Sequence, residues 1–143
     1  MPSYDPINDI VLASLPGIAY WVNAEQQIMC CNQAFADLLG HPDRRPLFGM
    51  SLRAIPLTGE QSPLLDAIIK DTAHVLSNRE SLESDETWHH PTTHKSQQYR
   101  CKREPMLEGN KVVGVLCIGD YINNEYTHIE RADSQLSNFI DFF

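Results

Sequence analysis

The sequence predicts an α+β fold in which five strands form one antiparallel sheet and helices cover one of its faces. Residues 15–40 read as strand, polar turn, strand and capped helix. Residues 63–76 repeat apolar side chains at helical spacing, and residues 112–120 form the most apolar strand candidate, which favours a central position. With 143 residues, the chain fits a single domain with a modest core and a flanking helix.

The first unit follows an amphipathic lead-in over residues 6–14, predicted to be helical and ended by Pro16-Gly17. In the next strand, alternate residues from Ile18 share one face, and a second strand over Gln27 to Cys31 returns beside it. Asn32 is a helix-capping residue, and the apolar residues that follow have helical spacing up to Gly40.

The second half contains one long helix and three strands. Ser62-Pro63 is a helix start, and the helix is expected to run to about Leu76. Strands are expected over residues 81–88, 96–105 and 112–120, and the last two flank a turn at residues 108–110. The long helix presents one apolar face, made of Leu65, Ile68, Ile69, Thr72 and Leu76.

Two short motifs resemble those of PAS domains. Residues 32–40 match the "N-x-A-F-x-x-L-L-G" helix of that family, and Asp120 matches the Asp at which the family's last strand exits. Gln26 replaces the usual turn Gly, and Asn123 replaces the usual Thr. The resemblance implies the strand order 2-1-5-4-3, a lead-in helix over residues 1–14, a PAS domain over 15–122 and an exit helix over 123–143.

In this family, ligands lie between the sheet and the helices. A solid core built from the same side chains is an equally good interpretation. Signal exit is expected at Asp120 and Tyr121. The candidate cavity residues are Tyr20, Val22, Met29, Phe35, Leu39, Ile55, Ile69, Tyr99, Val115 and Cys117.

Two known PAS chromophores have specific residue requirements. The flavin–cysteinyl adduct needs a Cys in a "G-R-N-C-R-F-L-Q" segment, and Leu52 stands at that position, which excludes the adduct. Haem needs an axial His facing the cavity from the long helix. His74 is the only His on that helix, and its angular position predicts that it faces solvent, which argues against haem.

The sequence gives little support to metal binding or to catalysis. His89, His90 and His94 lie near Glu86, but Pro91 prevents a helical pairing of these side chains, so no metal site is predicted. No nucleophile elbow, P-loop or dinucleotide fingerprint is present, and the domain is not predicted to be an enzyme.

Composition restricts the kinds of surface that the chain is expected to bind and the compartment in which it is expected to lie. A net charge of −8 argues against nucleic-acid and anionic membrane surfaces, and no apolar run is long enough to insert in a membrane. The four cysteines form no C-x-x-C pair, which is typical of reduced thiols in a cytoplasmic protein.

The resemblance therefore implies a cytoplasmic sensor domain within a larger signalling protein, such as a histidine kinase of a two-component system or a cyclic-dinucleotide enzyme. Ligand or partner binding would act on an effector domain in the same chain through the exit helix, and the domain is expected to form a homodimer. A ligand-free dimerisation module is the main alternative, and a haem-binding sensor is a less favoured one. The tail DSQLSNFIDFF resembles the lead-in, which leaves open whether a second domain follows Phe143.

Overall fold

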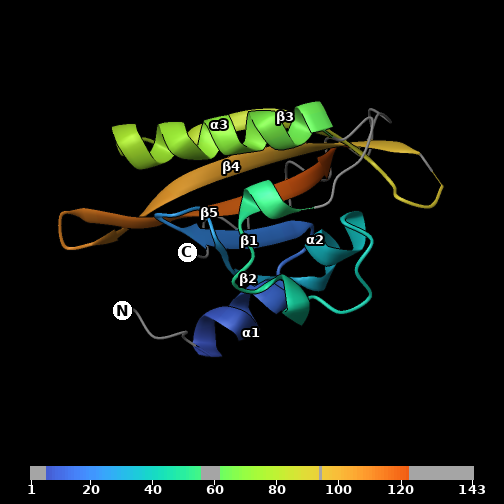
Figure 1. The fold of residues 1–143 in the computed structure, drawn as a ribbon, viewed down its shortest axis with the longest axis horizontal. Helices are drawn as coiled ribbons and strands as arrows, with labels where there is room; N and C mark the ends of the chain where they lie inside the picture. Colours follow the sequence, from blue (N-terminus) through green and yellow to red (C-terminus); the bar gives the residue numbers. More distant parts are fainter. Residues whose placement is uncertain (1–5, 56–61, 94, 123–143) are drawn as a thin grey trace.

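One five-stranded antiparallel sheet of order β2-β1-β5-β4-β3 organises the chain, as Figure 1 shows for the computed structural model. The structure describes residues 6–55, 62–93 and 95–122. The predicted fold and strand order are confirmed, with the apolar last strand at the centre. The strands are β1 (Ile18–Asn23), β2 (Ile28–Cys31), β3 (Leu82–His89), β4 (Ser96–Glu108) and β5 (Lys111–Ile122).

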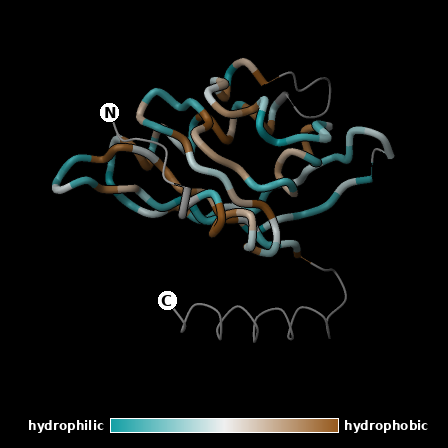
Figure 2. The backbone as a smooth tube through the Cα atoms, turned by 90° about the horizontal axis from the view of Figure 1, so that it is seen from below, coloured by the Kyte–Doolittle hydropathy of each residue, from teal (hydrophilic) through white to brown (hydrophobic). Residues whose placement is uncertain are grey.

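Helices lie against both faces of this sheet. The helical elements are α1 (Pro6–Ser14), α2 (Gln33–Leu38), η1 (Arg45–Leu47), η2 (Leu52–Ala54) and α3 (Ser62–Asn78). We call the face that packs against α2 and α3 the inner face; it carries Tyr20 and Val115 in the main core cluster. The outer face carries Trp21 and Cys30, which form a second cluster with Leu12 of α1. Hydrophilic segments, in teal, run along the projecting hairpins (Figure 2).

The β1–β2 turn closes without the glycine that is usual there. Gln26 adopts a left-handed conformation with φ 60°. The Asn23 side-chain oxygen accepts hydrogen bonds from the backbone N–H groups of Glu25 and Gln27, at 3.0 and 2.9 Å. These bonds stabilise the turn in place of the conformational freedom of glycine.

A bulge follows this turn and decides which way Met29 points. Trp21 pairs with Cys30, whereas the next residue, Val22, pairs with Ile28, so Met29 is an extra residue in β2. Met29 consequently packs in the outer cluster, although strand alternation had predicted that it joins Tyr20.

Strand β4 continues past Pro105, where the sequence predicted that it would end. Its pairing with β3 starts at Arg103, opposite Leu82, so among the described strands the residues after Arg103 pair with β5 alone. Proline is tolerated where one edge of a strand has no hydrogen-bonding partner.

The long helix α3 presents the predicted apolar face to the core. Ile68, Ile69, Thr72 and Val75 are buried. His74 is exposed, as its angular position predicted. The expected exit helix over residues 123–143 lies outside the described residues.

Candidate functional site

A row of side chains crosses the whole inner face of the sheet. Cross-strand pairing places Cys31, Tyr20, Cys117, Arg103 and Leu82 directly opposite one another on β2, β1, β5, β4 and β3. In an antiparallel sheet, directly opposed residues project from the same face. The register of the strands therefore places Arg103 in a largely apolar core.

Arg103 forms a buried ion pair with Glu86 of β3. Its Nη2 lies 2.7 Å from Glu86 Oε2, and the two side chains are 0% and 5% exposed. Burying a charge pair carries a large desolvation cost, which good geometry and additional hydrogen bonds must offset. A pair in this position is therefore a specific feature of the core and not a solvated surface contact.

Hydrogen bonds from three neighbours complete a buried polar cluster around the pair. Arg103 Nη2 donates to the Tyr20 hydroxyl at 3.1 Å and Nη1 donates to Ser84 Oγ at 3.4 Å. The Trp88 indole N–H donates to Glu86 Oε1 at 3.2 Å. We call these five residues, Tyr20, Ser84, Glu86, Trp88 and Arg103, the Arg103 cluster.

One donor in the Arg103 cluster lacks an acceptor. Arg103 Nε is buried and has no hydrogen-bond partner among the described residues. An unpaired buried donor on a charged group costs about 1–3 kcal/mol or more, and most native buried donors are paired. The Nε–H group can thus still donate a hydrogen bond.

The electrostatics of the cluster fix its protonation states. Burial raises the pKa of the Tyr20 phenol well above its usual value, although Arg103 partly opposes this, so Tyr20 is neutral. Burial lowers the pKa of Arg103, but Tyr20, Cys117 and Glu86 outweigh it and the pKa is raised overall. A hydrogen bond between Cys101 and Cys117 raises the pKa of Cys101 and lowers that of Cys117. In the cluster, Arg103 is therefore a permanent cation and Tyr20 is a neutral hydrogen-bonding partner.

Aromatic rings frame the cluster on the helix side. The Phe35 ring stacks on Tyr20 with centroids 4.2 Å apart and meets Trp88 edge-on at 6.0 Å. Asn32 positions α2 and therefore Phe35. Its side-chain oxygen accepts from the backbone N–H groups of Ala19 and Phe35, both at 3.1 Å, and its amide donates to Gly17 O at 2.9 Å. Because Asn32 is 3% exposed, these bonds tie the helix start firmly to β1.

Most of the predicted cavity residues do meet in the main core cluster. Leu39 lies at its edge, and Met29 is on the other face because of the bulge. Whether the set lines a ligand site stays a prediction. The buried members are Tyr20, Val22, Phe35, Ile55, Ile69, Tyr99, Val115 and Cys117.

The charged part of the site was not among the predicted residues. Strand alternation places Arg103 on the face of Tyr99 and Cys101, and Glu86 on the face of Trp88. On each of two strands a charged residue alternates in phase with buried neighbours, and this pattern is the signal from which the charged residues of the site could have been predicted. The register of β3 and β4 puts both residues on one face, and only the ion pair in the folded structure shows that the two charges meet.

The predicted exit residues lie near the end of β5. Tyr121 is 47% exposed, and its ring meets that of Tyr99 edge-on at 6.1 Å. Asp120 pairs with Arg100 across β4 and β5, and partial burial raises the pKa of its carboxyl group.

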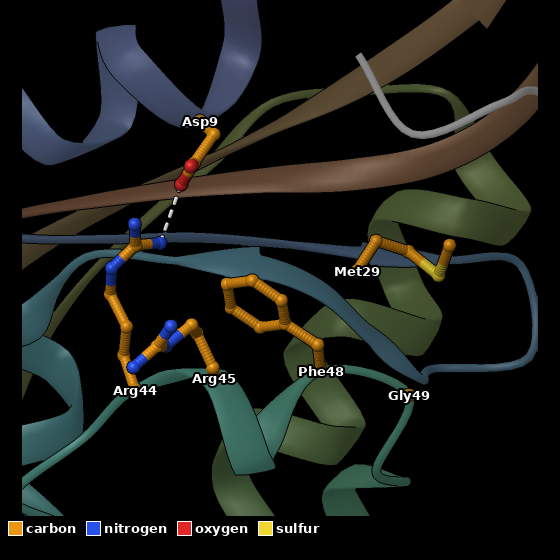
Figure 3. A pocket seen from close by; sticks show the side chains of 6 residues that line it. All are labelled: Asp9, Met29, Arg44, Arg45, Phe48 and Gly49. Carbon is orange, nitrogen blue, oxygen red and sulfur yellow. Dashed lines mark hydrogen bonds and ion pairs between the residues drawn. The ribbon is translucent and has the colours of Figure 1, made fainter. Parts of the chain in front are cut away.

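A hollow lies on the other side of the sheet from the Arg103 cluster. It has a volume of about 530 Å³ and is lined by Asp9, Met29, Arg44, Arg45, Phe48 and Gly49 (Figure 3). Arg44 forms an ion pair with Asp9 at 2.5 Å and lies over the Phe48 ring, 5.5 Å from its centroid. Arg45 pairs with Asp43 at 2.9 Å. Both guanidinium groups are already paired with carboxylates, which weakens the attraction of this hollow for an anionic ligand.

Metal-binding groups and membrane-spanning helices are both absent from the described part of the chain. No group of three or more His, Cys, Asp or Glu side chains there is arranged to hold a metal ion. Within the same residue ranges, no helix is long and apolar enough to cross a membrane.

Comparison with known proteins identifies the family. Residues 12–127 match the family described as PAS fold, and the chain therefore belongs to the PAS family. A search of curated proteins found no match.

Solved structures show the same fold at low sequence identity. VqmA of Vibrio cholerae is similar with a TM-score of 0.70 and 16% identity, over 84% of this chain and 52% of VqmA, so the chain spans about half of that protein. The PAS domain of Bordetella pertussis BvgS has a TM-score of 0.69 and 16% identity, over 92% of this chain and 95% of that domain. A LOV protein of Rhodobacter sphaeroides has a TM-score of 0.61 and 15% identity, over 87% and 69% of the two chains.

Proposed function

We propose that this PAS domain is a signal-input module of a larger cytoplasmic protein, not an enzyme, and that it senses a small molecule at the Arg103 cluster. One observation carries the proposal: an Arg–Glu pair that is 0% and 5% exposed stands among aromatic rings on the inner face of the sheet. A core that served only for packing would gain more from apolar residues of similar volume. Among proteins of similar fold, a VqmA structure is described as bound to DPO.

The route of the signal is the second part of the proposal. Arg103 lies directly opposite Cys117 of β5, and β5 leads to Asp120 and Tyr121. A ligand that moves Arg103 shifts β5 and the Tyr99–Tyr121 contact, and thereby biases an effector that follows in the same chain, such as a histidine kinase or a cyclic-dinucleotide enzyme.

Native mass spectrometry of the purified chain tests the sensing role. A small molecule that co-purifies with the parent and is lost from Arg103→Met supports it. Retention of the same molecule by Arg103→Met would contradict the assignment to this cluster. Removal of residues 124–143 should leave ligand binding intact and abolish coupling to the effector in the full-length host; coupling that survives would refute the route.

A pairing module is the second candidate function, and a specific observation favours it. Ile10 and Val11 on α1 are 69% and 41% exposed although they are apolar. One of the solved VqmA structures with a similar fold is that of a dimer. Sedimentation of Ile10→Glu beside the parent tests this: a parent dimer that becomes a monomer in the variant supports pairing through α1, and an unchanged state contradicts it.

A further inference from the structure

We propose that the Arg103 cluster selects an uncharged small molecule with an apolar body and one strong hydrogen-bond acceptor, a carbonyl oxygen or a heteroaromatic nitrogen, which binds Arg103 Nε–H. This inference rests on the proposed sensing role and names the chemical class of the ligand.

The need for an acceptor follows from the hydrogen bonds of Arg103. Both of its terminal nitrogens have partners, Glu86 and Tyr20 for Nη2 and Ser84 for Nη1. Only Nε, which is equally buried, has none among the described residues. A ligand that supplies an acceptor there satisfies this donor without disrupting the existing contacts.

The absence of net charge on the ligand follows from the charge balance of the core. Arg103 and Glu86 already neutralise each other at 2.7 Å. A carboxylate ligand would compete with Glu86 for the guanidinium group and leave one anion buried without a counterion. A cationic ligand would leave Arg103 in the same position. Both outcomes carry the full desolvation penalty of an unpaired buried charge.

The apolar body follows from the side chains around the pair. The Tyr20, Phe35 and Trp88 rings contact one another beside the ion pair, and the buried thiols of Cys101 and Cys117 line the same face. Rings and thiols offer dispersion contacts to an apolar group and little polar surface.

The access route lies at the edge of the sheet. Leu82, at the start of the edge strand β3, pairs directly with Arg103 and is only partly buried, as is Leu76 near the end of α3. Movement of these two leucines opens a path along the sheet from solvent to Arg103, because among the described residues no strand lies beyond β3.

A set of single-ring probes of nearly equal size tests the ligand class. Benzamide is uncharged and carries a carbonyl acceptor, benzoate is an anion, benzylammonium is a cation and toluene has no acceptor. Each is titrated to millimolar concentration into the 143-residue chain, and the Arg103 Nε–H signal is followed by side-chain NMR. Arg103→Lys, which keeps the cation and lacks Nε, identifies that signal. Arg100→Lys, an exposed site on the same strand, is the matched control.

Benzamide is expected to shift the Arg103 signal and to bind roughly 100-fold more tightly than benzoate or benzylammonium. Toluene should bind weakly and leave the signal in place. The Arg100→Lys variant should retain this ranking. In Arg103→Met combined with Glu86→Leu, which replaces the pair by apolar residues and keeps the core filled, the preference should pass from benzamide to toluene.

Other outcomes would overturn the inference in distinguishable ways. If benzoate or benzylammonium shifts the signal at lower concentration than benzamide, the ligand class is wrong while a sensing site at Arg103 survives. If no probe shifts any core signal, the inference fails together with small-molecule sensing at this cluster. If Arg103 Nε–H exchanges with a bound water in the presence of every probe, a buried water is its acceptor and the inference is wrong.

Discussion

Two Arg–carboxylate pairs join the same two strands from opposite faces. On the inner face Arg103 of β4 pairs with Glu86 of β3 at 2.7 Å, and these side chains are 0% and 5% exposed. On the outer face Arg100 of β4 pairs with Asp85 of β3 at 3.2 Å, and these side chains are 60% and 59% exposed. The strands and the kinds of charged group are the same, and the two pairs differ chiefly in burial, although only Arg100 and Asp85 are directly opposed in the register.

The difference shows that the energetic consequence of an ion pair depends on how exposed the pair is. The exposed pair is screened by water and salt, and pairs of this kind contribute about 0–1 kcal/mol. The buried pair gains strong attraction at a large desolvation cost, so its net contribution is small while loss of one partner is severe. The inner pair therefore contributes little net stability and provides a specific polar site in the core, which supports a role in recognition.

Removal of one buried charge should produce the largest effect. Arg103→Met leaves Glu86 buried with the Trp88 N–H as its remaining partner, and the free energy of unfolding should fall by about 3–5 kcal/mol. Urea denaturation followed by tryptophan fluorescence measures this. The double variant with Glu86→Leu should recover most of the loss, and a double variant as unstable as the single one would show that the pair itself stabilises the fold.

Removal of one neutral partner should have an intermediate effect. Tyr20→Phe deletes the hydroxyl that accepts from Arg103 Nη2 at 3.1 Å and should lower the free energy of unfolding by about 1–2 kcal/mol. Tyr121→Phe, whose parent residue is 47% exposed, is the control and should change stability by less than about 0.5 kcal/mol. Equal losses in the two variants would contradict the special position of Tyr20.

Removal of the exposed pair should have a small effect. Arg100→Gln should lower the free energy of unfolding by about 0–1 kcal/mol, and the difference should shrink further in high salt. Parallel urea denaturation at low and high ionic strength measures both quantities. A loss similar to that of Arg103→Met would refute the view that burial separates the two pairs.

The smallest effect on stability is expected at Asp120 of β5, which lies opposite Arg100 of β4. This effect should depend on pH. Partial burial raises the pKa of Asp120 in the folded protein. A raised pKa means that folding favours the protonated carboxyl, so this contribution is complete below the ordinary Asp value of about 4 and is lost as the pH rises through the folded value. Asp120→Asn should therefore be slightly more stable than the parent at neutral pH.

Stability curves of the two proteins between pH 3 and pH 8, roughly the range in which an Asp carboxyl titrates in proteins, measure this difference. The advantage of the variant should disappear on the acid side. An advantage that grows toward low pH would mean that the pKa of Asp120 is lowered instead, through its neighbour Arg100.

Local patterns in the chain were sufficient to predict most of the fold. The Asn32 cap, the alternation of β1 and the apolar run of β5 are local features, and each was found where it was expected. Met29 was not, because the bulge that turns it outward depends on pairing between two strands.

The sequence by itself determined the PAS fold, because periodicity, caps and turns act over a few residues. It also placed Arg103 in phase with buried neighbours on β4. Only the tertiary structure decided that Arg103 meets Glu86. The register of β3 and β4, which the packing of the whole sheet sets, places the two side chains on one face opposite Leu82 and Tyr99, and the ion pair joins them diagonally across the strands. The candidate site is a product of that register, and no single stretch of the chain contains it.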